Sequence, residues 1–230
     1  MVNKEKDIRM IEGKKHLPQY VQNRFIKRIL KNNLIIILTY IVFQSMLHTN
    51  KKETVFKISI TLIFSFFLMI FFDPFTALLI GHLSNAIFNG HIPAMLIHMG
   101  FGNKTPAEFL EYVEKMYSRI SNNKNIQYAY AYGSLSRGNY KVTSDIDIRL
   151  VPQQGKWIAV LIFIMIERSR ALFNWFPLDI YAFEKEELFN KMRSDEKPIE
   201  FKKTSENVYD DVITFNEFEE IFKQRNMDNI

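Results

Sequence analysis

Cysteine is absent from the chain of 230 residues. This absence excludes a disulfide scaffold, a zinc–thiolate site and a cysteine nucleophile, and it fits a reducing compartment. The chain also lacks a dense run of like charges, because its modest net charge of +5 is concentrated in residues 1–33. A charged nucleic-acid-binding tail is therefore not expected. The length leaves room for one domain with an extra element, or for two small domains.

Hydrophobic residues make up 47% of the sequence, and they are most concentrated in residues 34–101. Two apolar runs, residues 34–47 and 58–72, flank a polar link at residues 48–57. Neither run has polar residues at helical spacing, which favours helices that are apolar on all sides. We therefore predict an all-α hydrophobic hairpin that associates with a lipid bilayer. Because the first run is shorter than the ~20 residues of a bilayer-spanning helix, a buried core hairpin and a re-entrant hairpin are the alternatives.

Residues 1–33 are rich in Lys and Arg and contain an amphipathic pattern around Phe25 and Ile29. A helix there would lay its cationic face on anionic lipid, or it would cover its own protein. No small-residue cleavage site follows the first apolar run, so that run is not typical of a signal peptide. The basic residues ahead of it predict a cytoplasmic N-terminus, and two passes return the chain to the cytoplasm. Lysines in the polar link weaken this topology and suit a re-entrant hairpin better.

The end of the apolar block contains polar residues at helical spacing, namely His82, Asn85 and Asn89. These side chains would share one helix face. That face would lie either at the entrance to an active site or at a lipid–water boundary. His82 could also be grouped with His91 and His98 as metal ligands. No carboxylate joins the three histidines at ligand spacing, so we do not expect a histidine metal site.

The sequence pattern changes near residue 104. Thr105-Pro106 followed by Glu108 predicts a capping box at the start of a helix. Apolar residues then recur at 3.6-residue spacing, and the order to about residue 183 is helix, strand, loop, strand, helix, strand. We therefore divide the chain into a basic segment (residues 1–33), a hydrophobic hairpin (34–101), an α/β domain (104–185) and a helical C-terminal extension (186–230).

Three acidic residues of the α/β domain are predicted to converge. Asp145 and Asp147 are two residues apart in a strand, so their side chains leave the same face. Two carboxylates at one point repel each other unless a cation lies between them, and hard oxygen ligands suit Mg²⁺. Asp179 is the second residue of another predicted strand, residues 178–183, which follows an apolar helix at residues 157–175. If the two strands are neighbours, Asp179 reaches the same ions.

A glycine turn lies between the first strand of the domain and the acidic pair. Gly133 and Ser134 follow the strand at residues 126–132. Glycine lets a phosphate approach the backbone, while amide N–H groups and the serine hydroxyl donate to it. Arg137 is placed to bind phosphate through its forked guanidinium, and Lys141 is a weaker candidate. The alternative, a surface hairpin with Asp residues at its mouth, does not explain why two carboxylates share a face beside this turn.

The order Gly-Ser, two residues, Arg-Gly, then Ser-Asp-hydrophobic-Asp at residues 133–147 resembles the signature of the DNA polymerase β-like nucleotidyltransferase superfamily. It is most similar to the minimal and antibiotic-modifying members. The resemblance implies an α/β (α+β) nucleotidyltransferase fold, with a small mixed sheet flanked by helices. It also implies transfer of a nucleoside monophosphate from an NTP, with ATP as the expected donor, to a hydroxyl, with release of pyrophosphate. Asp145, Asp147 and Asp179 would then hold two Mg²⁺ ions, with Mn²⁺ as the alternative.

The predicted anchor and the resemblance together suggest a location and an acceptor. Because NTPs are cytosolic, we expect the protein at the cell membrane with its catalytic domain on the cytoplasmic side, and a hydroxyl acceptor near the membrane. Two other functions stay open: a catalytically silent nucleotide-binding regulatory or sensor protein, and an antitoxin-like nucleotidyltransferase that modifies a partner protein. The intact carboxylate trio argues against the first, and the apolar block argues against the second. A nucleic-acid substrate is not expected, because the domain lacks a basic and aromatic track for a strand.

Overall fold

The computed structural model describes residues 38–39, 41–44, 46, 49–90, 92–97, 104–133, 135–137, 140–141, 144–185, 188, 197–204 and 211–226. The chain divides into two units, residues 1–39 and 40–230, and the helices and strands named below lie in the second. The predicted basic segment, half of the first apolar run, and Ser134, His91 and His98 lie outside the described residues.

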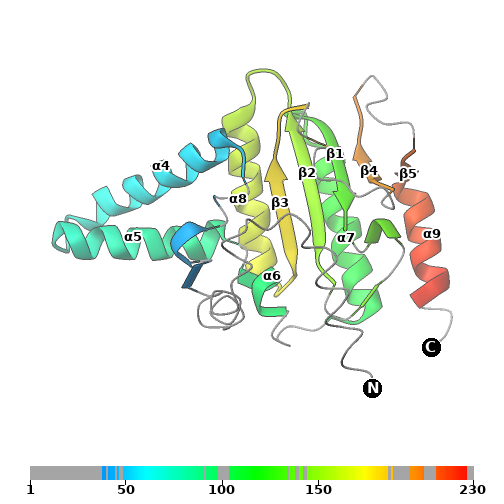
Figure 1. Ribbon diagram of the computed structural model, residues 1–230, viewed down its shortest axis with the longest axis horizontal. Coiled ribbons are helices and arrows are strands. Elements are labelled where there is room, and N and C mark those ends of the chain that lie inside the picture. Colours follow the sequence, from blue (N-terminus) through cyan, green and yellow to red (C-terminus); the bar gives the residue numbers. More distant parts are fainter. Residues whose placement is uncertain are drawn as a thin grey trace, which may run out of the picture. The chain divides into compact units, whose positions relative to one another are not determined.

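A five-stranded mixed sheet forms the centre of residues 40–230 (Figure 1). Its strands are β1 (Ile126–Tyr132), β2 (Ile146–Pro152), β3 (Leu178–Ala182), β4 (Ile199–Lys202) and β5 (Ile213–Thr214). The spatial order is β3-β2-β1-β4-β5. Strand β1 is antiparallel to both of its neighbours, whereas β2 and β3 are parallel, as are β4 and β5. The expected small mixed sheet flanked by helices is confirmed.

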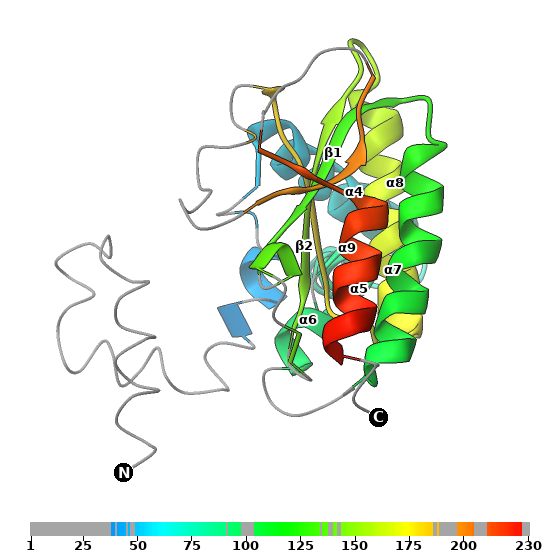
Figure 2. The same ribbon diagram turned by 90° about the vertical axis from the view of Figure 1, so that its right-hand side faces the viewer.

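Three helices cover one face of this sheet: α7 (Pro106–Ser121), α8 (Trp157–Phe173) and α9 (Phe215–Asn226) (Figure 2). The predicted capping box begins α7, because Thr105 Oγ1 accepts the Glu108 N–H at 3.3 Å and Glu108 Oε2 accepts the Thr105 N–H at 2.9 Å. The core lies between sheet and helices and is built from alternate strand residues and the apolar helix faces, including Val113, Met116, Ile148, Ile164, Ile180 and Phe218. Two short elements complete this region, η2 (Leu135–Arg137) and α6 (Ile92–Ile97).

The C-terminal segment contributes more than the expected helices. Residues 186–230 supply β4 and β5 as well as α9. Ile199 and Phe201 are buried while their neighbours in β4 are half-buried, which is the alternation of a strand with one covered face. This run is only four residues long, too short to show a clear period in the sequence.

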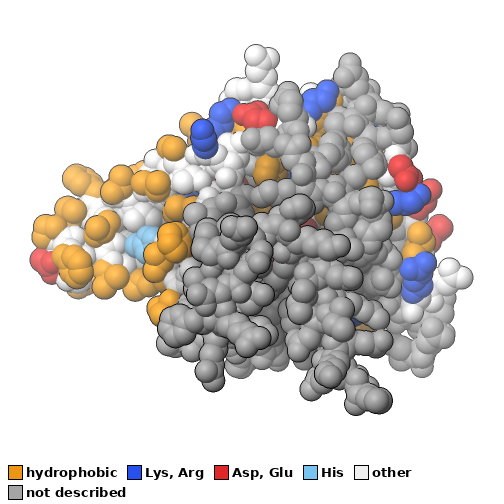
Figure 3. Space-filling view, in the orientation of Figure 1, with side chains coloured by type: hydrophobic (Ala, Val, Ile, Leu, Met, Phe, Trp, Pro, Cys, Tyr) orange, Lys and Arg blue, Asp and Glu red, His pale blue; other side chains and the backbone are white. Residues whose placement is uncertain are grey.

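Two further helices, α4 (Lys51–Leu68) and α5 (Pro74–Asn89), pack against each other and extend away from the sheet (Figure 1). Asn50 and Asp73 cap their first turns. The inner face of this pair is polar or small, and its buried residues are Glu53, Lys57, Thr61 and Ser65 on α4 and Ala77, Gly81, Asn85, Ala86 and Asn89 on α5. Large apolar side chains point outward instead and gather over the outer end of the pair (Figure 3), among them Phe66, Phe71 and Phe75.

The expected location at the cell membrane is wrong for the residues that the structure describes, because none of their helices is long and apolar enough to cross a bilayer. The apolar hairpin is not supported either, and neither is the bilayer as a partner. Residues 51–57, read as a polar link, form the first two turns of α4, so this helix includes three lysines and one glutamate. Helix α5 has 16 residues, fewer than the ~20 that a hydrocarbon core requires.

The polar stripe at the end of the apolar block faces inward. Asn85 Nδ2 lies within hydrogen-bond distance of Gln44 Oε1 (3.0 Å), the Lys57 carbonyl (2.8 Å) and Thr61 Oγ1 (3.0 Å). Asn89 Oδ1 accepts from Arg168 of α8. The stripe therefore joins α5 to α4 and α8 and does not line a lipid–water boundary.

Candidate functional site

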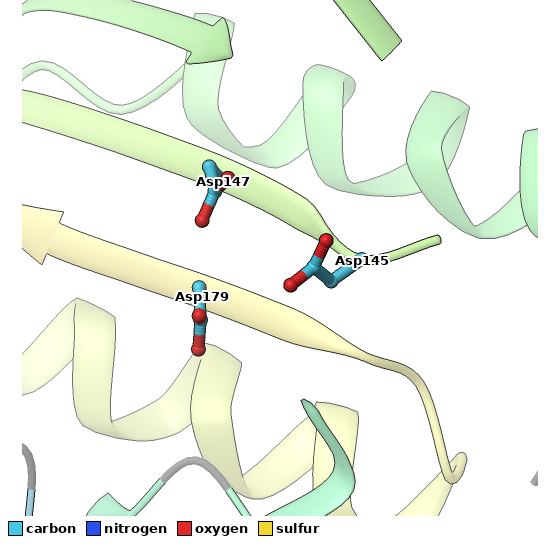
Figure 4. A group of neighbouring side chains, drawn as sticks. All are labelled: Asp145, Asp147 and Asp179. Carbon is cyan, nitrogen blue, oxygen red and sulfur yellow. The ribbon is translucent and has the colours of Figure 1, made fainter. Parts of the chain in front are cut away.

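The three predicted acidic residues lie together at one end of β2 and β3. Asp145 immediately precedes β2, Asp147 lies within it, and Asp179 is the second residue of β3. Asp147 and Asp179 are directly paired in the register of the two parallel strands. One carboxylate oxygen from each of the three residues lies within 4.8 Å of the others. Figure 4 shows the side chains of Asp145, Asp147 and Asp179 as neighbours at β2 and β3.

Strand alternation explains why these carboxylates share a face. Ile146, Ile148 and Ile180 are fully buried and point into the core beneath the helices. Asp147 and Asp179, which alternate with them, therefore leave the opposite face of the sheet. All three carboxylates are half-buried, so water is partly excluded around them while a ligand keeps access.

The glycine turn lies against this cluster. Gly133 follows β1 with a φ of +81°, a left-handed conformation that side-chain-bearing residues rarely adopt. A Cβ atom at this position would lie 2.6 Å from Asp147 Oδ2. Glycine is thus required on two grounds, conformation and space, and it brings the backbone next to the Asp147 carboxylate. The Gly133 carbonyl accepts from Ser136 Oγ at 2.9 Å, which holds the turn.

The structure describes the other predicted phosphate-binding residues only in part. Arg137 ends η2, but its side chain lies outside the described structure, as does Ser134. Lys141 is exposed, and its backbone N–H donates to Ser144 Oγ at 2.9 Å. The nucleotide-binding roles of Ser134, Arg137 and Lys141 stay predictions.

Sequence reasoning missed a group of buried charges beside Asp179, which consists of Glu53 and Lys57 of α4 and Arg168 of α8. Arg168 Nη2 donates to Glu53 Oε1 at 2.6 Å, and Lys57 Nζ lies 3.5 Å from the same oxygen. Arg168 lies in the polar stretch Glu167–Arg170 of α8, so its sequence neighbours give no signal that it is buried. Buried charges are rare unless they are paired.

Burial and the neighbouring charges shift the pKa values of Lys57 and Glu53. Burial, followed by the charge of Arg168, lowers the pKa of Lys57 from 10.5 to about 7, although the negative charges of Glu53 and Asp179 oppose the shift. Burial alone would raise the pKa of Glu53, but the charges of Arg168 and Lys57 outweigh it and hold that pKa below its ordinary value. The charge of Asp179 thus acts on Lys57, which links the buried group to the carboxylate cluster.

The donor chemistry of the cluster fits a divalent metal. Three carboxylates offer only oxygen ligands, which Mg²⁺ and Mn²⁺ prefer. Their like charges at this separation repel one another, and a cation between them would relieve that repulsion. Asp145, Asp147 and Asp179 could therefore hold such an ion from two adjacent strands.

A comparison with protein families agrees with this geometry. Residues 114–204 match the family model Polymerase beta, Nucleotidyltransferase. The match supports the superfamily expected from the sequence and, in general terms, a role in nucleotidyl transfer. It runs from within α7 to β4 and includes all three carboxylates, whereas α4 and α5 lie outside it. Searches of curated proteins and of solved structures found no significant match.

Proposed function

We propose that this chain transfers a nucleoside monophosphate from an NTP, with ATP as the expected donor, to a hydroxyl group, and releases pyrophosphate. The observation that carries the proposal is the convergence of Asp145, Asp147 and Asp179 within 4.8 Å. The nucleotidyltransferase match over the same residues supports it.

Each part of the site has a role in this proposal. Asp145 and Asp147 would hold two Mg²⁺ ions, and Asp179 would bind one of them or accept the proton of the acceptor hydroxyl. Bound Mg²⁺ would neutralise charge on the triphosphate and lower the pKa of the attacking hydroxyl. The absence of a side chain at Gly133 makes room for the Asp147 carboxylate, and it would let a phosphate approach the backbone N–H groups of the turn.

Cations near the turn would complete the binding of the nucleotide. The guanidinium of Arg137 would bind phosphate oxygens in a forked geometry, with Lys141 as a second cation. The hydroxyl of Ser134 would add a further donor. These groups orient the triphosphate, while the carboxylates of β2 and β3 hold the reacting centre.

The test is release of pyrophosphate from each of the four NTPs in the presence of Mg²⁺ and a cell extract as the source of acceptor. We expect release with one NTP, and a decrease of more than about 100-fold in the Asp147→Asn variant, which exceeds typical losses from changes outside the metal ligands. Asp211→Asn is the matched control, since Asp211 is exposed and pairs with Lys197 on the surface. Tight NTP binding without release would contradict the proposal and favour the silent nucleotide-binding function.

A further inference from the structure

Strand β3 carries Asp179 and lies at the edge of the sheet. Residues 177 and 183 face β2, because the Pro177 carbonyl accepts the Ile146 N–H at 3.0 Å and the Phe183 N–H donates to the Leu150 carbonyl at 2.9 Å. The even-numbered residues therefore direct their backbone groups away from β2. An edge strand of this kind normally leaves such groups to water or to another chain.

In this protein a buried ion pair binds the outer edge of β3. The guanidinium of Arg168 donates from Nη2 to the Ile180 carbonyl. The carboxylate of Glu53 accepts the Ala182 N–H through Oε2 at 3.2 Å. The same two side chains bind each other, with Arg168 Nη2 donating to Glu53 Oε1 at 2.6 Å.

The pair occupies the place of one residue of a further parallel strand. Such a residue would donate its N–H to the Ile180 carbonyl and accept the Ala182 N–H through its own carbonyl. Arg168 supplies the donor and Glu53 supplies the acceptor, each from a helix. The strand is thus bound along both edges at the residues that follow Asp179.

The pair is itself held firmly. Both side chains are 1% exposed. Arg168 Nη1 also donates to Asn89 Oδ1 at 2.9 Å, and Lys57, 3.5 Å from Glu53, donates to the Gln44 carbonyl at 2.7 Å. Helices α4, α5 and α8 therefore all contribute to the support of β3.

We propose that Glu53 and Arg168 are positioning residues for Asp179. By fixing the backbone at Ile180 and Ala182, they hold the Asp179 carboxylate at the distance from Asp145 and Asp147 that a shared metal ion requires. The inference rests on the function proposed above, because it concerns the metal role of Asp179. It assigns a purpose to α4, which lies outside the nucleotidyltransferase match.

The test compares two double variants of α8 ion pairs. Glu53→Leu/Arg168→Met removes both members of the pair at once, so that neither is left buried without the other, and it also removes both bonds to β3; Lys57 keeps its bond to the Gln44 carbonyl. Arg119→Met/Glu167→Leu is the matched control: this pair joins α7 to α8, its Glu167 side chain is fully buried, and neither residue bonds to β3. Mn²⁺ affinity is measured by electron paramagnetic resonance, and thermal unfolding is followed in parallel.

We expect the first double variant to bind Mn²⁺ about 10- to 100-fold more weakly, which is the usual effect of replacing residues that support metal ligands. The control variant should bind Mn²⁺ as the wild type does. Glu53→Gln offers a single acceptor oxygen to the Ala182 N–H and Arg168 Nη2, so it should bind Mn²⁺ more weakly than the wild type but more tightly than the double variant. A folded Glu53→Leu/Arg168→Met variant with wild-type Mn²⁺ affinity would overturn the inference.

Two further measurements keep the outcomes distinct. Asp179→Asn is titrated with Mn²⁺ alongside: if it binds as the wild type does, the proposed metal site fails rather than the positioning role alone. If the double variant does not fold, amide exchange at Ala182 is compared between wild type and Glu53→Gln, and with Arg168→Lys, which cannot reach all its partners at once. Faster exchange at Ala182 together with weaker Mn²⁺ binding in Arg168→Lys is expected, and unchanged values for both would overturn the inference.

Discussion

Gly133 shows how one residue can decide the geometry of the site. It combines a φ of +81° with a Cβ position only 2.6 Å from Asp147 Oδ2. Gly155 has a similar φ of +73°, but a Cβ there would meet nothing within 4 Å. The two glycines therefore separate the effect of backbone strain from the effect of crowding at the carboxylate.

We expect Gly133→Ala and Gly155→Ala to lower the free energy of unfolding by a similar amount, about 1–3 kcal/mol each, because both force alanine into a left-handed conformation. Only Gly133→Ala should also displace Asp147 and abolish NTP turnover and tight Mn²⁺ binding. Urea denaturation and Mn²⁺ titration of the two variants check this. Equal metal affinity in both variants would show that the turn does not shape the site.

Lys57 gives the protein a stability that depends on pH. Its pKa is about 7 when folded, because burial and then the charge of Arg168 lower it from 10.5. Between these two values the unfolded chain binds more protons than the folded protein does, so folding becomes more favourable as the pH rises. Below pH 7 both states carry the proton, and the cost of burying the charge is present in full.

We therefore expect Lys57→Met to be most stable relative to the wild type below pH 7, and this advantage to shrink as the pH rises toward 10. The slope of the difference in unfolding free energy should approach about 1.4 kcal/mol per pH unit. Urea denaturation of both proteins at pH 6.5, 8 and 9.5 measures it. Parallel pH profiles would mean that Lys57 keeps its ordinary pKa in the folded protein.

At the scale of elements, the features that could be predicted from the sequence are those that local patterns determine. The capping box of Thr105 and Glu108 gives the start of α7 because each bond joins residues three apart. Asp145 and Asp147 could be placed on one face because the strand period is two. The bond between Glu53 and Ala182 joins residues 129 apart in sequence, and no local pattern reports a partner at that distance.

Strand β4 belongs to the same structural unit as the site, although its segment was expected to be a helical extension. Phe201 is 2% exposed and packs edge-on against Tyr117 of α7 and Phe215 of α9, with ring centroids 5.6 and 5.4 Å apart. The strand pairs with β1, whose other neighbour β2 carries Asp147.

Phe201→Ala should therefore cost about 3–5 kcal/mol of unfolding free energy, as the loss of a buried phenylalanine ring does. Mn²⁺ affinity should fall in the same denaturant range as the helical signal, because sheet and site unfold together. Circular dichroism and Mn²⁺ titration across a urea series measure both. A site that keeps its metal affinity after α9 and β4 have unfolded would show that the C-terminal segment is separate.

At the scale of the molecule, the sequence-based prediction was wrong about the helical pair of α4 and α5, which was expected to be apolar on all sides. Its outward side chains are large and apolar, while the buried ones are small or polar. Average hydropathy is dominated by the large residues, so the runs resembled helices apolar on all sides. The small inward residues Thr61, Ser65 and Gly81 interrupt the apolar pattern too weakly to mark a face. Their role is apparent only in the folded protein, where Thr61 contacts Asn85 and Gly81 lies against Ser65.

The central claim is that the three carboxylates support transfer of a nucleoside monophosphate. Incubating the wild type and Asp147→Asn with Mg²⁺, a cell extract and the same NTP labelled at either the α- or the γ-phosphorus tests it most directly. We expect the wild type to transfer the α-label to an acceptor and to release the γ-label as pyrophosphate, and Asp147→Asn to do neither. Transfer of the γ-label to the acceptor, or equal transfer of the α-label by Asp147→Asn, would contradict the account.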